Sequence, residues 1–189
     1  MKPPSTMNDY LGRAVKGLIA LIGAEDSTEG AMKAEQLNEL VYQMLETERA
    51  GMRVYETALE CAIHPDLKKE WTKYLEQTTT HEQLVLELME KLELDPAAET
   101  PGRQVVRHIG ESLVAAMKMA KSAAPPQAAQ LVACECVVEA ETKDHLNWEL
   151  LHQASAHGPA DRKKAMREAY EQVEEQEDEH LYLIFPRRR

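Results

Sequence analysis

Six carboxylate and imidazole residues interrupt helix faces that are otherwise apolar. They are Glu48, His81, Glu141, His145, Glu177 and His180. When each helical segment is advanced by about 100° per residue, all six fall among Leu, Val, Met, Tyr and Trp positions that are typical of a buried face. One buried polar residue is usually a hydrogen-bonded core group. Several at matching depth can neutralise one another only around a cation, so the pattern indicates a metal site.

The spacing of these residues favours the same interpretation. Glu177 and His180 are three residues apart, so both project from one face of a helix. Carboxylate-bridged dimetal bundles use one Glu from each of two helices and a Glu-x-x-His pair from each of the other two. Glu48 and Glu141 match the single Glu positions, and Glu177 with His180 forms one complete pair. His145, four residues after Glu141, is predicted as a ligand from its position on the stripe.

The second expected pair is incomplete, because Thr78 stands where the Glu before His81 should be. A hydroxyl is a weak ligand and cannot bridge two metals as a carboxylate does. Two alternatives remain: an asymmetric pair of ions, with His145 compensating, or a single ion. Acidic and amide residues flank the stripe, and a local bulge could turn one of them inward; they are Glu76, Gln77 and Glu82.

The expected donors are three carboxylates and three imidazoles, a set that suits Fe, Mn or Zn better than Mg or Ca. We expect two iron ions, with Mn or Zn as alternatives. Asp144 and Asp178 adjoin the predicted ligands and are expected to orient the ligating imidazoles. Such a centre usually reacts with O₂ or peroxide, so these are the expected partners beside the metal ions.

Proline and glycine divide the chain into segments that read as helices, and no segment reads as a strand. The expected helices span about 8–22, 33–63, 65–94, 104–122, 126–156 and 160–185. Four of them are long, about 40 Å each. The prediction is an all-α four-helix bundle over 31–189 with a short inserted helix at 104–122, preceded by a short helix and linker over 1–30.

Local motifs resemble those of a known family. The stretch Leu75–His81, followed by a Leu-rich helix, the stretch Leu45–Gly51 and the short inserted helix resemble YciF-type stress-associated proteins of the ferritin-like superfamily. The resemblance covers about 33–185 and implies a ferritin-like bundle with a dinuclear iron or manganese site. It assigns ligand roles to Glu48, His81, Glu141, Glu177 and His180. The expected function is an oxygen- or peroxide-reactive oxidoreductase. The alternative is a non-catalytic metal-binding stress protein or a structural bundle.

Composition excludes several classes of function. The net charge of −11 argues against nucleic acid as a partner. The apolar run at 18–22 is too short to span a bilayer, so no membrane partner is expected. Three cysteines without a Cys-x-x-Cys motif predict neither a disulfide framework nor a thiolate zinc site, which favours a cytoplasmic setting. A homodimer would give the apolar positions of helix 8–22 a surface to cover.

Overall fold

The computed structural model describes residues 34–157, 160 and 162–184, except for the side chains at 157, 178 and 181–184. Within these ranges every regular element is a helix: α2 (Ala34–Cys61), α3 (Pro65–Lys91), α4 (Pro101–Ala123), α5 (Pro126–His157), α6 (Lys163–Tyr170) and α7 (Glu174–Ile184). The all-α prediction is therefore confirmed. The helix expected at 8–22 and the linker after it lie outside the described residues.

Three helices begin at a proline, which is favoured in the first turn because it has no N–H to satisfy. α3 starts at Pro65, where the Nδ1 of His64 accepts a hydrogen bond from the backbone N–H of Asp66 at 3.2 Å. α4 starts at Pro101, and the Oγ1 of Thr100 accepts from the N–H of Arg103 at 3.2 Å. These caps explain why the breakers read from the sequence mark the starts of helices.

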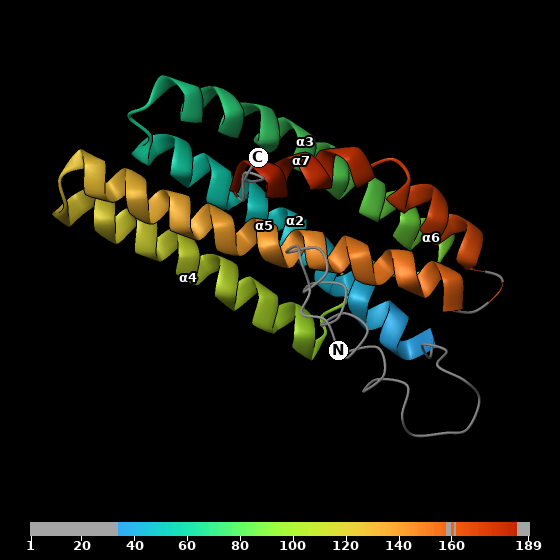
Figure 1. The fold of residues 1–189 in the computed structure, drawn as a ribbon. Coiled ribbons are helices and arrows are strands. Elements are labelled where there is room, and N and C mark those ends of the chain that lie inside the picture. Colours follow the sequence, from blue (N-terminus) through green and yellow to red (C-terminus); the bar gives the residue numbers. More distant parts are fainter. Residues whose placement is uncertain (1–33, 158–159, 161, 185–189) are drawn as a thin grey trace, which may run out of the picture.

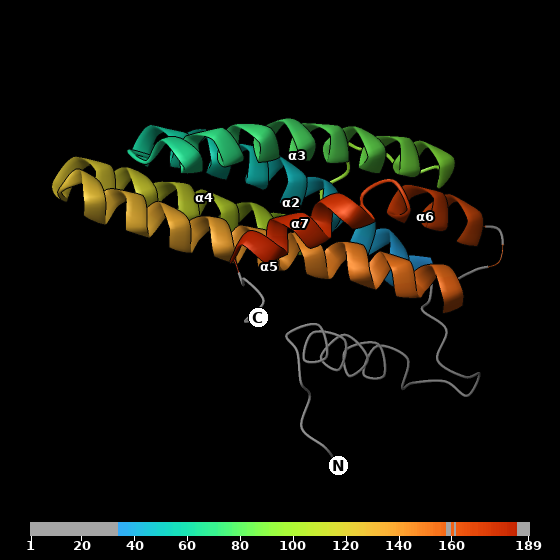
Figure 2. The same cartoon turned by 45° about the horizontal axis from the view of Figure 1, so that its top comes forward.

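The helices run nearly side by side (Figures 1 and 2). α2 is central and packs against α3, α4 and α5, while α6 and α7 both pack against α5. The buried apolar residues form two clusters at different depths of the bundle. One includes Leu37, Met44, Val85 and Trp148; the other includes Val54, Trp71, Tyr74, Met117 and Val137.

The prediction of one continuous long helix at 160–185 is wrong, because a turn at 171–173 separates α6 from α7. The chain tightens there into i→i+3 hydrogen bonds, with the N–H of Val173 bonded to the carbonyl of Tyr170 at 3.0 Å. No Gly or Pro marks this turn. Figure 2 shows the change of direction between the two helices. The inserted helix is also longer than expected, at 23 residues rather than a short segment.

A buried ion-pair network joins α4 to α2. Glu46 is 3% exposed, and its Oε2 accepts from Arg103 Nε at 3.1 Å and from Arg107 Nη2 at 3.0 Å. The two helices also approach closely at Gly110, where an added Cβ would lie 2.5 Å from the Cβ of Ala50. These contacts hold α2, which carries Glu48, against its outer neighbour.

Among the described residues, no helix combines the length and the apolar character that crossing a membrane requires.

Candidate metal centre

A belt of buried polar residues lies between the two apolar clusters. Five of the six predicted ligands (Glu48, His81, Glu141, Glu177 and His180) and the neighbouring Asp144 are each no more than 4% exposed. They come from α2, α3, α5 and α7. Charged side chains are rarely buried to this degree unless they are paired with one another or coordinate a metal.

The tightest group consists of Glu48, His81 and Asp144. One ligand atom from each of these residues lies within 4.8 Å of the other two. Bonds of about 2.0–2.2 Å place two ligand atoms of one ion at most about 4.4 Å apart. Small side-chain rotations would therefore bring all three atoms to bonding distance of one cation.

Two carboxylate oxygens of this group have no hydrogen-bond partner among the described residues. They are the Oε2 of Glu48 and the Oδ1 of Asp144. The other oxygen of Glu48 accepts from Trp148 Nε1 at 2.9 Å, which fixes the orientation of the carboxylate. Buried polar atoms are almost always satisfied. The two carboxyl groups also lie within hydrogen-bonding reach of each other, so a shared proton satisfies them when they are neutral and a cation when they are ionised.

His81 is held from α7. Its Nδ1 lies 3.0 Å from the Oε1 of Glu177, and its Nε2 lies 3.0 Å from the Oε1 of Gln176. The turn at 171–173 directly precedes these residues, so the start of α7 delivers both of them to the imidazole. The Nε2 is thus hydrogen-bonded, as the second ring nitrogen of a metal-binding histidine typically is, and Nδ1, which has no hydrogen bond among the described residues, is the nitrogen left to face a cation.

A second pair of buried ligand-type residues adjoins the first group. The Nδ1 of His180 lies 2.9 Å from the Oε2 of Glu141, and its Nε2 lies 2.9 Å from the Oε1 of Gln77. The other oxygen of Glu141 accepts from the hydroxyl of Tyr55 at 2.7 Å. The ring centroids of His81 and His180 are 6.0 Å apart, so the two groups are neighbours within one belt.

Without a cation, burial and the repulsion between neighbouring carboxylates disfavour the ionised form of Glu48 and Asp144. Burial raises the pKa of Glu48 well above its ordinary value, and the charges of Asp144 and Glu177 raise it further. Burial likewise raises the pKa of Asp144, reinforced by Glu177 and Glu141. Burial lowers the pKa of His81, a shift that the charge of Asp144 partly offsets. A divalent cation would stabilise the ionised carboxylates and the neutral imidazole together.

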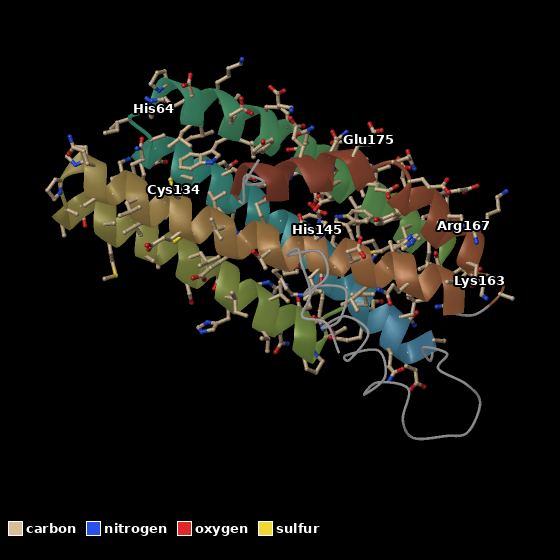
Figure 3. All side chains as sticks on the ribbon, in the orientation of Figure 1. His64, Cys134, His145, Lys163, Arg167 and Glu175 are labelled. Carbon is tan, nitrogen blue, oxygen red and sulfur yellow. The ribbon has the colours of Figure 1, made fainter. Side chains whose placement is uncertain are left out.

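Two residues discussed in the sequence analysis lie apart from the tight group. His145 is 5% exposed on α5, near the middle of that helix (Figure 3), and its Nδ1 has no hydrogen-bond partner among the described residues. Its role as a ligand stays a prediction. Thr78 is 1% exposed, and its Oγ1 likewise has no partner within the described part of the chain. It occupies the core position without supplying a carboxylate.

The structure places three further residues in the belt: the sequence analysis named Asp144 as an orienting residue and Gln77 as a flanking one, and it did not name Gln176. Asp144 was expected only to orient an imidazole, and it belongs to the tight group instead. Its spacing of three from Glu141 and four from Trp148 puts it on the same helix face, which was the available signal. Gln77 and Gln176 contact the two imidazoles, and α3 needs no bulge to present Gln77.

The remaining residues that the sequence analysis named beside the predicted ligands are Glu76, Glu82 and Asp178. Glu82 pairs with Arg49 at 2.7 Å, and Glu76 is exposed. The side chain of Asp178 is outside the described part of the structure.

The donor set of the belt, carboxylates with imidazoles, fits iron, manganese or zinc. Compared with known protein families, with curated proteins and with solved structures, the chain matches none of them.

Proposed function

We propose that this protein binds metal in the polar belt of its helical core, through Glu48, His81 and Asp144. The observation that carries the proposal is the convergence of three buried ligand atoms within 4.8 Å of one another. Two of these residues contribute a carboxylate oxygen that has no hydrogen-bond partner among the described residues. Burying such groups without a cation costs several kcal/mol, which a bound ion would offset.

We further propose that the centre is dinuclear, with iron or manganese as its metals. Glu141, Glu177 and His180 lie beside the tight group and supply two more carboxylates and one more imidazole. Together these residues match the four carboxylates and two histidines that bind metal in a ferritin-like dimetal bundle. Asp144 supplies the carboxylate that Thr78 lacks. In that role Asp144, and not His145, compensates for the missing Glu before His81.

An iron or manganese pair would supply electrons for reduction of O₂ or peroxide. The residues around it orient the ligand side chains. The hydroxyl of Tyr55 donates a hydrogen bond to Glu141, and burial, together with the charge of Glu141, raises the pKa of this phenol and keeps it protonated. Gln77 and Gln176 hold the two imidazoles in position. Trp148 holds the carboxylate of Glu48.

Metal titration tests the first part of the proposal. Metal-free protein is titrated with Mn(II), and with Fe(II) without oxygen, and the stoichiometry is read by calorimetry and metal analysis. Asp144→Asn should weaken the tightest site about 100-fold, because loss of a ligand costs at least as much as loss of a hydrogen-bond partner of a ligand. Glu139→Gln, an exposed change on the same helix, is the matched control. Equal affinity in both variants would refute this site.

Spectroscopy tests the second part. Two Mn(II) ions in adjacent positions give an exchange-coupled electron paramagnetic resonance spectrum, whereas one ion gives an uncoupled spectrum. Iron-loaded protein mixed with O₂ or peroxide should change its absorption spectrum within seconds. Full metal occupancy without any spectral change would support the alternative function, a non-catalytic metal-binding stress protein.

A further inference from the structure

A cavity of about 260 Å³ adjoins the belt on the side of Glu141 and His180. Its walls come from α2, α3, α5 and α7 and include the aromatic side chains of Tyr55, Trp71 and Tyr74. Cys134 also lines it, and Figure 3 shows this residue on α5 beyond the end of α7. The cavity thus extends from His180 on α7 toward Cys134 on α5.

One polar group in the cavity wall, the hydroxyl of Tyr74, has no hydrogen-bond partner among the described residues. Tyr74 is 4% exposed. Its ring is fixed against the imidazole of His180, with the centroids 4.2 Å apart. A hydroxyl buried to this degree is normally hydrogen-bonded, so its position in a cavity wall calls for an oxygen or nitrogen on a bound molecule.

The size and charge of the cavity limit the class of that molecule. A cavity of about 150 Å³ holds benzene. A volume of about 260 Å³ therefore holds a substituted ring or two fused rings, less than a drug-sized ligand requires. Among the described residues, the charged side chains in its wall are the carboxylates Glu70 and Glu141, and none is a Lys or Arg. Carboxylates disfavour an anion, so the ligand carries no negative charge.

We propose that this cavity binds a small neutral phenol, with the ring among the aromatic and valine side chains and the hydroxyl bonded to that of Tyr74. Aromatic side chains favour an aromatic guest in stacked or edge-to-face contact. A phenol hydroxyl both accepts from and donates to the Tyr74 hydroxyl, which satisfies both groups. Binding of the phenol does not rest on the proposed function, because it needs no metal.

Calorimetric titration of metal-free protein with p-cresol tests the proposal. p-Toluate, which has the same ring and methyl group but carries a negative charge, is the matched probe. We expect p-cresol to bind at least tenfold more tightly than p-toluate. Tyr74→Phe keeps the ring and removes the hydroxyl, and should weaken p-cresol binding about two- to tenfold, the effect of one hydrogen bond.

A cavity-filling variant keeps the test independent of the hydrogen bond. Val138→Phe places a larger side chain in the cavity wall and should abolish binding. Val132→Phe, a half-buried position on α5 that does not line the cavity, should leave it intact. Circular dichroism checks that both variants are folded.

Three results would overturn the proposal: no heat of binding with folded protein, equal affinity for p-cresol and p-toluate, or full binding by Val138→Phe. Metal binding is measured separately without p-cresol. Failure of the cavity proposal with normal metal binding is therefore distinct from failure of the proposed function.

Discussion

Replacing Glu48 by Gln separates the two roles of this buried carboxylate, metal binding and packing. Gln has nearly the same shape, and its Oε1 can still accept the hydrogen bond from Trp148 Nε1. Its amide nitrogen takes the position of Oε2, the oxygen without a hydrogen-bond partner among the described residues. From there it can donate to the carboxylate of Asp144. The substitution therefore removes a metal ligand while leaving the core filled.

The loss of metal affinity has a calculable effect on stability. A cation that binds only the folded chain at 100 times its dissociation constant stabilises the fold by about 2.7 kcal/mol. For a chain of this size that raises the melting temperature by about 5–11 °C. If Glu48→Gln weakens binding about 100-fold, the same metal concentration contributes only about 0.4 kcal/mol. The metal-induced rise should then shrink to about 1–2 °C.

Without metal, we expect the opposite order of stability: Glu48→Gln should be at least as stable as wild type. Burial raises the pKa of Glu48 above the ordinary value of 4.5. The folded state therefore binds more protons than the unfolded state once the pH exceeds about 4.5. The contribution of Glu48 to stability falls as the pH rises from there toward the raised folded pKa. Gln carries no proton to lose, so metal-free Glu48→Gln should be at least as stable as wild type at pH 7.

Melting curves of wild type, Glu48→Gln and the exposed control Glu87→Gln, with and without Mn(II), provide the measurement. The control should behave as wild type in both conditions. The reasoning is refuted if Glu48→Gln keeps the full rise with Mn(II). It is equally refuted if the metal-free variant is several kcal/mol less stable than wild type at pH 7.

Three further predictions concern the scaffold. Burial acts to raise the pKa of Glu46, but the hydrogen bonds and charges of its two arginines outweigh this effect and hold the pKa below 4.5. The network should therefore stabilise the fold above about pH 4.5, and this stabilisation should be lost as the pH falls. In urea unfolding, Glu46→Gln should lower the unfolding free energy by about 3–5 kcal/mol at pH 7 and by less at pH 3.5. Gly110→Ala should cost about 1–3 kcal/mol in the same assay, since its Cβ would lie 2.5 Å from that of Ala50. Glu93 adopts a φ of 57°, so Glu93→Gly should raise the unfolding free energy by about 1 kcal/mol.

The two glycine predictions each have a control on the same helix or at its end, and the Glu46 prediction is checked by its pH dependence. Ser112→Ala, an exposed change in α4, should leave stability nearly unchanged, and an equal loss there would contradict the close-approach argument at Gly110. Glu90→Gly, within the last turn of α3, should destabilise the protein, because glycine lowers helix propensity. A pH-independent loss in Glu46→Gln would show that its ionisation contributes nothing.

Much of the fold could be predicted because local chemistry sets it. Pro65, Pro101 and Pro126 each begin a helix, since proline suits the first turn and not the interior. The apolar stripes likewise identify the buried faces, because helical periodicity places side chains at known angles. The break between α6 and α7 carries no such local signal. The apolar stripe that includes Met166 and Val173 continues with helical spacing through the turn, so the sequence does not mark it.

The sequence by itself placed all six predicted ligands in the core, since each falls on an apolar stripe, but it did not identify other buried charged residues such as Glu46 and Arg103. Only the tertiary structure decided which of them meet. Asp144 and His145 are adjacent, so their side chains diverge by about 100°, and the packing of α5 against its neighbours selects Asp144 for the tight group. Periodicity places a residue on a face, but the rotation and axial position of each helix come from the contacts it makes with the others.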